Sequence, residues 1–242
     1  MAVKPKKNVS KAPVEKKVER IKTGIPGLDK ILKGGMPKGA VVLVTGGAGT
    51  GKTTFLSQFL WKGLQEGEKC LYITLEETPE DIINDAVLYG WDFTPYQKSG
   101  KFRIDFFDPF ELGDVNARLK DMIAVNKFTR VVIDSTSLFG MYLNDEYKIR
   151  KKLFKLTHDL KDAKCTALIS AEIPENSKAL SRYGVEEFVV DGVIVLYYLG
   201  LGEGIFRNVA VRKMRRTDHR HGAFPLEMTN KGIRILVESG IL

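Results

Sequence analysis

The sequence predicts an α/β fold: a mostly parallel β-sheet with helices on both faces and an antiparallel strand addition near the C-terminus. Short apolar runs rich in β-branched residues alternate with amphipathic segments between residues 41 and 171. From residue 193 onward, strand-like runs follow one another without helices between them. Alternating strands and helices are typical of parallel sheets, and 242 residues with 43% hydrophobic content can bury the core of one such domain.

The expected elements can be placed along the chain from these patterns. Strands are expected at residues 41–45, 71–75, 102–107, 130–133 and 165–171, and then at 193–198, 208–214 and 233–237. Helices are expected from about residue 51 to 66, from 79 to 89, from Asp114 as a cap to about 127, and from 146 to 161. Thr78 is a good N-cap for the second helix, and Pro79 suits its first position.

The net charge of +8 is concentrated at the N-terminus. Residues 1–20 contain seven Lys or Arg and two Glu, whereas the rest of the chain contains 31 basic and 28 acidic residues. Residues 1–17 have no hydrophobic periodicity, so we expect a disordered basic arm followed by a single domain at residues 18–242. The arm could be a solubilising extension or a nucleic-acid contact, and the sequence leaves both readings open.

Other features exclude whole classes of protein. No apolar run approaches the ~20 residues of a membrane helix, and the N-terminus has no apolar segment typical of a secretory signal. We therefore expect a cytoplasmic protein without a membrane partner. Cys70 and Cys165 each open an expected strand and lack metal-ligand spacing, which favours buried, reduced thiols.

A glycine-rich segment between the first strand and the first helix predicts a phosphate-binding loop. Residues 46–53 read GGAGTGKT, which matches the pattern G-x-x-x-x-G-K-[ST]. Glycines let successive backbone N–H groups turn towards phosphate, and the positive end of the following helix points at the same anion. Lys52 would contact the β- and γ-phosphates of ATP, and the Thr53 hydroxyl would be a Mg²⁺ ligand.

Carboxylates at two further strand ends are candidate catalytic groups. Asp134 ends the apolar run of residues 131–133 and would hold the Mg²⁺ shell, although a strand-ending Asp can also be a simple turn residue. Glu76 and Glu77 follow the strand at 71–75, and a repelling carboxylate pair suits activation of the attacking water. Alternatively, both glutamates could simply open the next helix as polar residues.

With these segments in view, the chain resembles a single-domain KaiC-type member of the RecA/RadA superfamily of P-loop ATPases. The resemblance spans roughly residues 18–237. The segments that carry it are IKTGIPGLD at 21–29, GG at 34–35, LEETP at 75–79, YGWD at 89–92, SRYGVEEF at 181–188 and KMRRTDH at 213–219. It departs from the family at Arg216, where Gly is usual.

The resemblance implies roles for individual residues. Glu76 would be the catalytic base, Glu77 its neighbour, and Ser170 and Glu172 would lie at the γ-phosphate-sensing position. Thr229 and Asn230 would line the base side of the nucleotide. The full set of implied nucleotide-binding residues is Gly47, Ala48, Gly49, Thr50, Gly51, Lys52, Thr53, Thr54, Ser170, Lys213, Met214, Arg215, Thr217, His219, Thr229 and Asn230.

Lys213 and Arg215 are implied to act on the ATP of an adjacent subunit, together with Thr217 and His219. Independently of the family, Lys213 and Arg215 alternate on an expected strand, so both charges would face one way, which suits a triphosphate. The alternative is a solvated basic edge strand that discourages aggregation. The resemblance favours the first reading and implies a homo-oligomer, expected to be a hexameric ring.

The leading hypothesis is therefore an ATP hydrolase that acts in a ring as a slow switch or scaffold for an unknown protein partner. The alternative is a RadA-paralog-like DNA-binding or recombination accessory module in which ATP controls affinity, so DNA stays open as a partner. Autophosphorylation at the family's position is not expected, because Glu187 and Phe188 stand where the self-phosphorylating domain has Ser and Thr.

Overall fold

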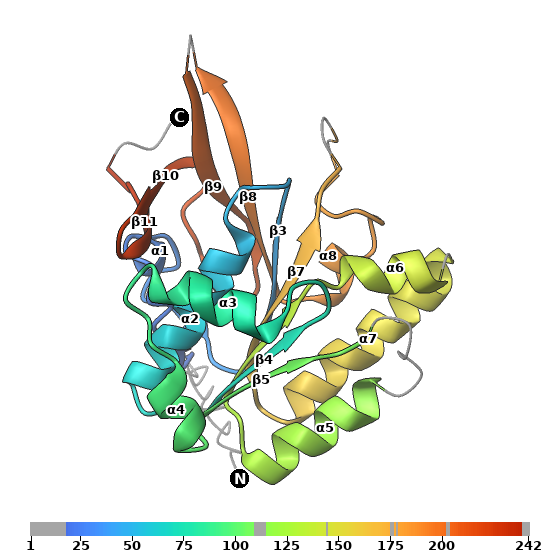
Figure 1. Ribbon diagram of the computed structural model, residues 1–242. Helices are drawn as coiled ribbons and strands as arrows, with labels where there is room; N and C mark the ends of the chain where they lie inside the picture. Colours follow the sequence, from blue (N-terminus) through green and yellow to red (C-terminus); the bar gives the residue numbers. More distant parts are fainter. Residues whose placement is uncertain are drawn as a thin grey trace, which may run out of the picture.

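A nine-stranded sheet forms the centre of the molecule (Figure 1). The computed structural model describes residues 18–108, 115–143, 145–174, 177, 179–201 and 204–238, so the predicted arm and the predicted cap Asp114 lie outside the described residues. The strand order is β11-β10-β9-β8-β3-β7-β6-β4-β5. The strands are β3 (Val41–Gly46), β4 (Cys70–Thr74), β5 (Phe102–Phe106), β6 (Arg130–Asp134), β7 (Thr166–Glu172), β8 (Gly192–Leu201), β9 (Gly204–Met214), β10 (Phe224–Thr229) and β11 (Gly232–Ile235).

Helices cover both faces of the sheet, as the sequence predicted. One face packs against α1 (Leu28–Ile31), α2 (Lys52–Gln65), α3 (Pro79–Val87) and α4 (Thr94–Lys98). The other packs against α5 (Val115–Asn126), α6 (Ser137–Leu143), α7 (Glu146–Asp162) and α8 (Glu186–Val189). Because side chains of a strand alternate between faces, successive residues of β3 contribute to the two cores in turn. No helix among the described residues is long and apolar enough to cross a membrane.

The parallel core from β3 to β7 is confirmed, and the C-terminal part of the sheet differs from expectation in three ways. β8 pairs parallel with β3, so the antiparallel addition begins only at β9. β10 was not predicted: Phe224, Leu226 and Met228 alternate along it as in a strand, but Pro225 inside the run disfavours one. β9 is not the outermost strand, since β10 and β11 follow it in the sheet order.

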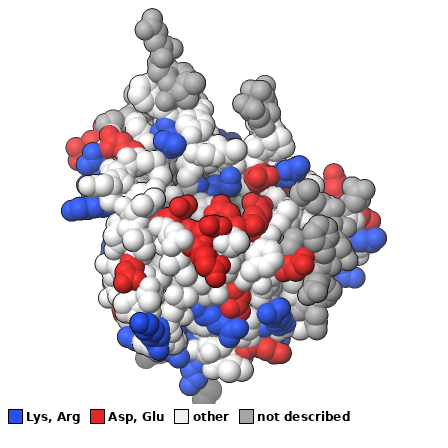
Figure 2. Space-filling view, viewed as in Figure 1, with Lys and Arg blue, Asp and Glu red and all other residues white. Residues whose placement is uncertain are grey.

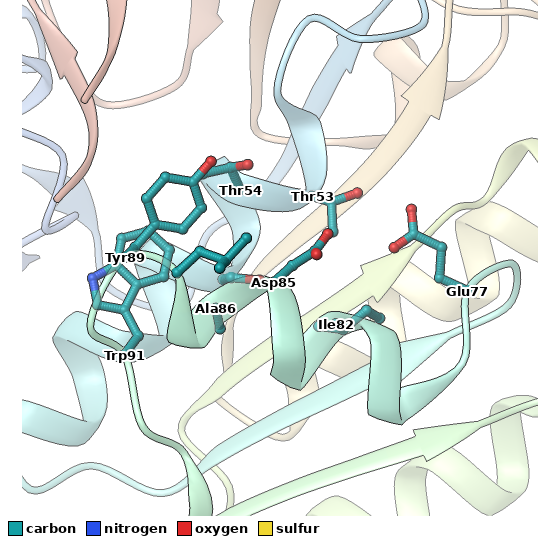
Figure 3. A pocket seen from close by; sticks show the side chains of 10 residues that line it. Thr53, Thr54, Glu77, Ile82, Asp85, Ala86, Tyr89 and Trp91 are labelled. Atoms are coloured by element: carbon teal, nitrogen blue, oxygen red, sulfur yellow. The ribbon is translucent and has the colours of Figure 1, made fainter. Parts of the chain in front are cut away.

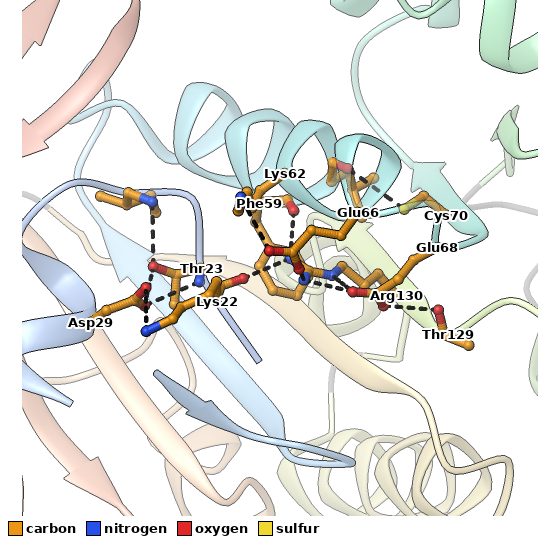
Figure 4. A network of polar contacts seen from close by, with 12 residues as sticks. Lys22, Thr23, Asp29, Phe59, Lys62, Glu66, Glu68, Cys70, Thr129 and Arg130 are labelled. Carbon is orange, nitrogen blue, oxygen red and sulfur yellow. Dashed lines mark hydrogen bonds and ion pairs between the residues drawn. The ribbon is translucent and has the colours of Figure 1, made fainter. Parts of the chain in front are cut away.

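A polar network connects the N-terminal segment that precedes the nine-stranded sheet to α2 (Figure 4). The short strands β1 (Arg20–Ile21) and β2 (Met36–Pro37) pair here as a separate small sheet. The fully buried Arg130 donates to Glu68 Oε1 at 2.9 and 2.7 Å, to Glu66 at 3.2 Å, and to the carbonyls of Lys22 and Phe59. A buried charge is tolerated only when it is paired in this way, so the network fixes the position of α2 relative to β6.

The strands of the parallel core end together at one edge of the sheet. Gly46 of β3 pairs with Glu172 of β7, and Thr74 of β4 pairs with Asp134 of β6. The carboxyl end of a parallel sheet is where α/β proteins place their ligands. The fold therefore brings three segments distant in sequence to one place: residues 46–53, 74–77 and 134–137.

Candidate functional site

The loop between β3 and α2 has the conformation of a phosphate cradle. Gly49 and Gly51 adopt φ values of 70° and 101°, a left-handed backbone that favours glycine. A Cβ at Gly46 would lie 2.3 Å from the carbonyl oxygen of Leu196, so that position has no room for a side chain. α2 begins at Lys52 as predicted, and its first N–H groups and positive end face the loop.

Lys52 lies over this loop. Its Nζ donates to the carbonyl oxygens of Gly46 and Gly47, each at 3.0 Å, and the Thr50 hydroxyl donates to Gly47 O at 2.9 Å. The ammonium group is therefore folded back across the segment that would enclose phosphate. Thr54, the last residue of the predicted set in this segment, occupies the first turn of α2 next to Thr53.

Asp134 is the centre of a hydrogen-bonded cluster at the carboxyl edge. Its Oδ2 accepts from the Thr53 hydroxyl at 3.1 Å and from Tyr72 Oη at 2.8 Å, while its Oδ1 accepts a short hydrogen bond from Ser170. The two predicted metal ligands, Thr53 and Asp134, are thus brought together, and a hydroxyl with a carboxylate oxygen fits Mg²⁺. No group of three or more His, Cys, Asp or Glu side chains that could hold a metal occurs among the described residues.

Glu76 lies directly beside this cluster. Its Oε1 accepts a hydrogen bond from Ser135 Oγ at 2.9 Å, and Ser135 follows Asp134 in the chain. Partial burial raises the pKa of Glu76 above its ordinary value, the hydrogen bond from Ser135 opposes this, and the carboxylates of Asp134 and Glu172 add to it. The geometry gives Glu76 a fixed orientation and a basicity above that of a free glutamate.

Glu77 points to a different place. It lines a pocket of about 150 Å³ between α2 and α3, together with Thr53, Thr54 and Asp85 (Figure 3). Tyr89 and Trp91 form the far wall, stacked with ring centroids 4.8 Å apart. Burial, and then the charges of Asp134 and Asp85, raise the pKa of Glu77. The two glutamates therefore have different surroundings: Glu76 lies beside Ser135, whereas Glu77 lines this pocket.

Two side chains that the sequence did not single out reach the phosphate loop from the β8–β9 hairpin. Tyr198 Oη donates to the carbonyl oxygen of Gly49 at 2.8 Å. Arg207 donates to the same oxygen at 3.4 and 3.3 Å, and its guanidinium lies 5.4 Å from the centre of the Tyr198 ring. Tyr72 and Ser135 were missed as well. None of the four belongs to a local motif, and only Ser135, adjacent to Asp134, could have been suspected.

The hairpin of β10 and β11 lies at the start of α2. A Cβ at Gly51 would be 3.4 Å from Met228 Sδ, and the predicted residues Thr229 and Asn230 follow Met228 in the chain. The Thr229 hydroxyl donates to Gly232 O at 2.8 Å within the hairpin turn. The structure thus brings Met228, the residue before Thr229, to the loop, and the Thr229 hydroxyl stabilises the hairpin turn.

Lys213, Met214 and Arg215 lie at the opposite end of the sheet from their own phosphate loop. Met214 pairs with Gly192, which pairs with Val42, whereas the loop begins at Gly46. Gly46 follows Val42 by four residues, so at ~3.3 Å per residue Met214 lies about 13 Å along the strand direction from the start of the loop. The register therefore keeps Lys213 and Arg215 away from phosphates bound in their own chain.

Both cations also contact their own chain here. Lys213 Nζ donates to the carbonyl oxygens of Glu187 and Val190 at 2.9 and 2.7 Å, and burial followed by the charge of Arg215 lowers the pKa of Lys213. Arg215 lies 3.6 Å from Asp191 and is exposed. β9 ends at Met214, so Arg215 belongs to the turn after the strand rather than to the strand itself.

The remaining predicted residues of this segment surround that turn. Thr217 Oγ1 accepts from Arg20 at 2.9 Å, and His219 is nearly buried with its Nδ1 3.1 Å from Arg220 O. Arg216, the residue that departs from the family pattern, has a φ of 61°. This left-handed conformation is the one that glycine favours, which explains why Gly is usual at this position.

The fold and the phosphate loop define a RecA-type P-loop nucleotide-binding protein. A family model described as "ATPase: KaiC" matches residues 21–240. The chain therefore belongs to the KaiC family of ATPases, a membership that implies nucleotide binding.

Individual relatives agree with this membership. A UPF0273 protein of Thermotoga maritima is 37% identical over 243 residues, which cover 92% of this chain and 98% of that protein. The circadian clock protein KaiC3 of Synechocystis is 36% identical over 236 residues, covering 93% of this chain and 47% of KaiC3. The crystal structure of a KaiC-like protein from Pyrococcus horikoshii OT3 superposes with a TM-score of 0.83 at 40% identity, covering 91% of this chain and 100% of that one. This chain thus corresponds to about half of KaiC3 and to nearly all of the single-domain relatives.

Proposed function

We propose that this protein binds Mg-ATP at residues 46–54 and hydrolyses it to ADP and phosphate. The observation that carries the proposal is the meeting of Glu76, Asp134 and Thr53 beside Lys52 at the carboxyl edge of the sheet. These groups come from three separate strand ends. Together they supply a base, ligands for a hard cation and a phosphate-binding ammonium, which are the parts that phosphoryl transfer to water requires.

Each residue has a distinct task in this reaction. Glu76 accepts a proton from the attacking water, whose oxygen forms a bond to the γ-phosphorus while the bond to the β–γ bridging oxygen breaks. Thr53 and Asp134 would hold Mg²⁺, which when bound neutralises phosphate charge. Lys52 stabilises the γ-phosphoryl oxygens, and Ser170 keeps Asp134 oriented through its hydrogen bond.

A second copy of the chain completes the site in this proposal. Charge that develops on the γ-phosphoryl oxygens calls for cations beyond Lys52, and the sheet register keeps Lys213 and Arg215 from reaching their own loop. Presented to a neighbour, they would finish the neighbour's site. A head-to-tail contact repeated around a ring, for which we propose six chains, gives each site one donor of these cations.

Such a ring would act as a slow ATP-dependent switch or scaffold for a protein partner. The alternative, a DNA-binding recombination accessory module, is not favoured. The relatives described above are named as KaiC, KaiC-like or UPF0273 proteins, and the chain after residue 20 carries nearly balanced charge. Measuring ATP turnover with and without single-stranded DNA separates the two, because only the alternative expects a response.

The test of the proposed function compares Glu76→Gln with Lys52→Ala. Glu76→Gln keeps the shape of the side chain but removes the base, so kcat should fall about 10²- to 10⁴-fold while calorimetric affinity for Mg-ATP stays nearly constant. Lys52→Ala should weaken binding itself. Glu77→Gln is the matched control, and it should retain most of the turnover. Undiminished hydrolysis by Glu76→Gln would assign the base elsewhere, and a wild-type protein without ATP turnover would refute the proposal.

A further inference from the structure

The β8–β9 hairpin holds one carbonyl oxygen of the phosphate loop. Tyr198 of β8 and Arg207 of β9 are paired across the two strands, so their side chains leave the sheet on the same face. Both donate to Gly49 O, Tyr198 through Oη at 2.8 Å and Arg207 through Nε and Nη2 at 3.4 and 3.3 Å. The Tyr198 contact has the ordinary length of a hydrogen bond and the Arg207 contacts are long, so Tyr198 is the principal donor.

This contact fixes the direction of one peptide group of the loop. The Gly49 carbonyl and the Thr50 N–H belong to the same planar trans peptide, so the N–H points the opposite way from the oxygen and away from Tyr198. In the part of the chain that the structure describes, the Thr50 N–H has no hydrogen-bond acceptor, although Thr50 is only 2% exposed. Buried backbone donors are rarely left without an acceptor, so this N–H is available to a ligand oxygen.

The loop itself does little to keep this peptide in one orientation. Gly49 has a φ of 70° and carries no side chain that would restrict the backbone to one arrangement. In the reversed orientation the Gly49 carbonyl oxygen would face the phosphate, and the negative end of its dipole would repel the anion. The donor at Thr50 therefore depends on a contact from outside the loop, which the hairpin supplies.

Arg207 contributes charge as well as hydrogen bonds. Figure 2 shows acidic side chains gathered over α3. Residues 76–91 contain five Asp or Glu and no Lys or Arg. This acidic border disfavours an incoming polyphosphate, and a guanidinium held at the phosphate loop opposes its field. The Tyr198 ring helps to hold that guanidinium, with its Cζ atom 5.4 Å from the ring centre.

We propose that Tyr198 and Arg207 are positioning residues for the nucleotide phosphates: through Gly49 O, they keep the Thr50 N–H turned towards the phosphate chain. The inference rests on the proposed function, because it assumes that residues 46–54 bind Mg-ATP. It adds the device that preorganises the loop, and Tyr198 supplies it from 149 positions further along the chain. A phosphate contact of this kind is made equally in the ground state and the transition state, so its loss should raise KM rather than lower kcat.

The experiment measures binding of Mg-ADP by calorimetry, which requires no hydrolysis. Tyr198→Phe removes only the hydroxyl, and the dissociation constant should rise about fivefold. Tyr198→Phe/Arg207→Met removes both donors and the charge, and should raise the dissociation constant at least about 30-fold.

The matched control is Tyr197→Phe/Arg212→Met, which makes the same two changes on the same two strands. Tyr197 packs against the core on the α7 side, and Arg212 is exposed. The hydrogen bonds to Gly49 come from Tyr198 and Arg207 instead. The control loses the same amount of charge and should bind Mg-ADP within about twofold of the wild type.

Two further measurements separate positioning of the loop from a purely structural role of the hairpin. Mg-ADP should slow hydrogen exchange of the Thr50 amide in the wild type, followed by NMR, and this protection should be lost in Tyr198→Phe/Arg207→Met. In the same variant, KM for ATP should rise in parallel with the dissociation constant, while kcat stays within about twofold. A role confined to stability would lower the urea midpoint and leave all three quantities unchanged.

The outcomes are distinct. A double variant that binds Mg-ADP like the wild type, a control that is weakened equally, or Thr50 protection that survives in the double variant would overturn the inference. A fall in kcat at constant KM would overturn it as well. A wild type that binds Mg-ADP but does not turn over ATP would refute only the proposed function, and one that binds neither nucleotide would refute both.

Discussion

At the residue scale, the properties of Glu76 depend on its immediate neighbours. Ser135 donates a hydrogen bond to its carboxylate at 2.9 Å, and Ser137 N donates to Ser135 Oγ at 3.3 Å. Ser137 Oγ in turn accepts from the backbone N–H of Glu172 at 2.8 Å. The proposed base is therefore held by a chain of hydrogen bonds that joins the ends of β4, β6 and β7.

Substituting Ser135 should change the pH dependence of hydrolysis. The hydrogen bond from Ser135 lowers the pKa of Glu76, so Ser135→Ala should raise it further. Because the base must be deprotonated, the acidic limb of the pH–kcat profile should move to higher pH. Loss of one hydrogen bond of about 1 kcal/mol should also reduce kcat roughly fivefold near neutrality. Ser135→Thr is the control, since it retains the hydroxyl. An acidic limb that is unchanged in Ser135→Ala would show that Glu76 does not control the rate.

At the element scale, two features hold the secondary structure in the arrangement that the site needs. The network around Arg130 fixes α2, which carries Lys52 and Thr53, relative to β6, which carries Asp134. The turn at Arg216 redirects the chain after β9 and so places Arg215 beside Asp191. Both features are stability determinants rather than parts of the chemistry.

Removing Arg130 should destabilise the fold strongly. Arg130→Ala leaves Glu66 and Glu68 without their shared cation, and the carbonyls of Lys22 and Phe59 without a donor. The free energy of unfolding should fall by about 3–5 kcal/mol in urea denaturation. Arg103→Ala is the control, because it breaks an exposed ion pair with Asp105 at 2.7 Å and should cost less than about 1 kcal/mol. Equal losses in the two variants would mean that burial of Arg130 is not what matters.

Replacing Arg216 with glycine should stabilise the protein. A side chain in left-handed backbone costs roughly 1–2 kcal/mol, part of which is offset because glycine gains freedom in the unfolded chain. Arg216→Gly should therefore raise the free energy of unfolding by about 0.5–1 kcal/mol, measured by the same denaturation. Arg216→Ala keeps a Cβ and should give no such gain. If Ala and Gly stabilise equally, the effect comes from losing the arginine side chain and not from the backbone.

At the scale of the whole molecule, the proposed site is divided between two ends of one sheet. Its phosphate loop and base lie at the carboxyl edge of the parallel strands, while Lys213 and Arg215 lie towards the other end. A single chain thus carries both halves of a site without being able to join them. On the proposed function, this division would make hydrolysis depend on assembly.

Complementation should reveal that dependence. Lys213→Ala/Arg215→Ala should bind ATP but hydrolyse it poorly, and Lys52→Ala should bind it weakly. Mixed together, they should regain part of the wild-type turnover, because some interfaces pair an intact phosphate loop with intact cations. Exchange of chains between assemblies must be verified first, for example by energy transfer between labelled subunits. Exchanged mixtures that stay inactive, or a hydrolytically active monomer by light scattering, would exclude the shared site.

The sequence by itself determined the local parts of this protein. The pattern at residues 46–53 predicted the strand, loop and helix correctly, because glycine conformation and helix polarity act within a few residues. Alternating apolar runs predicted the parallel core, and Thr78 caps α3 as expected, accepting from Asp81 N. The candidate residues Lys52, Thr53, Glu76 and Asp134 could all be named from segments of this kind.

Only the tertiary structure decided which distant residues meet. The parallel pairing of β8 with β3, the presence of β10, and the contacts of Tyr198 and Arg207 with the phosphate loop depend on strand register, which no local pattern records. Register also places Met214, next to Lys213, about 13 Å along the sheet from its own loop. Local chemistry can be predicted from neighbouring residues. The pairing of β8 with β3, and the contacts of Tyr198 and Arg207 with Gly49, join residues about 150 positions apart and are set by the packing of the whole sheet.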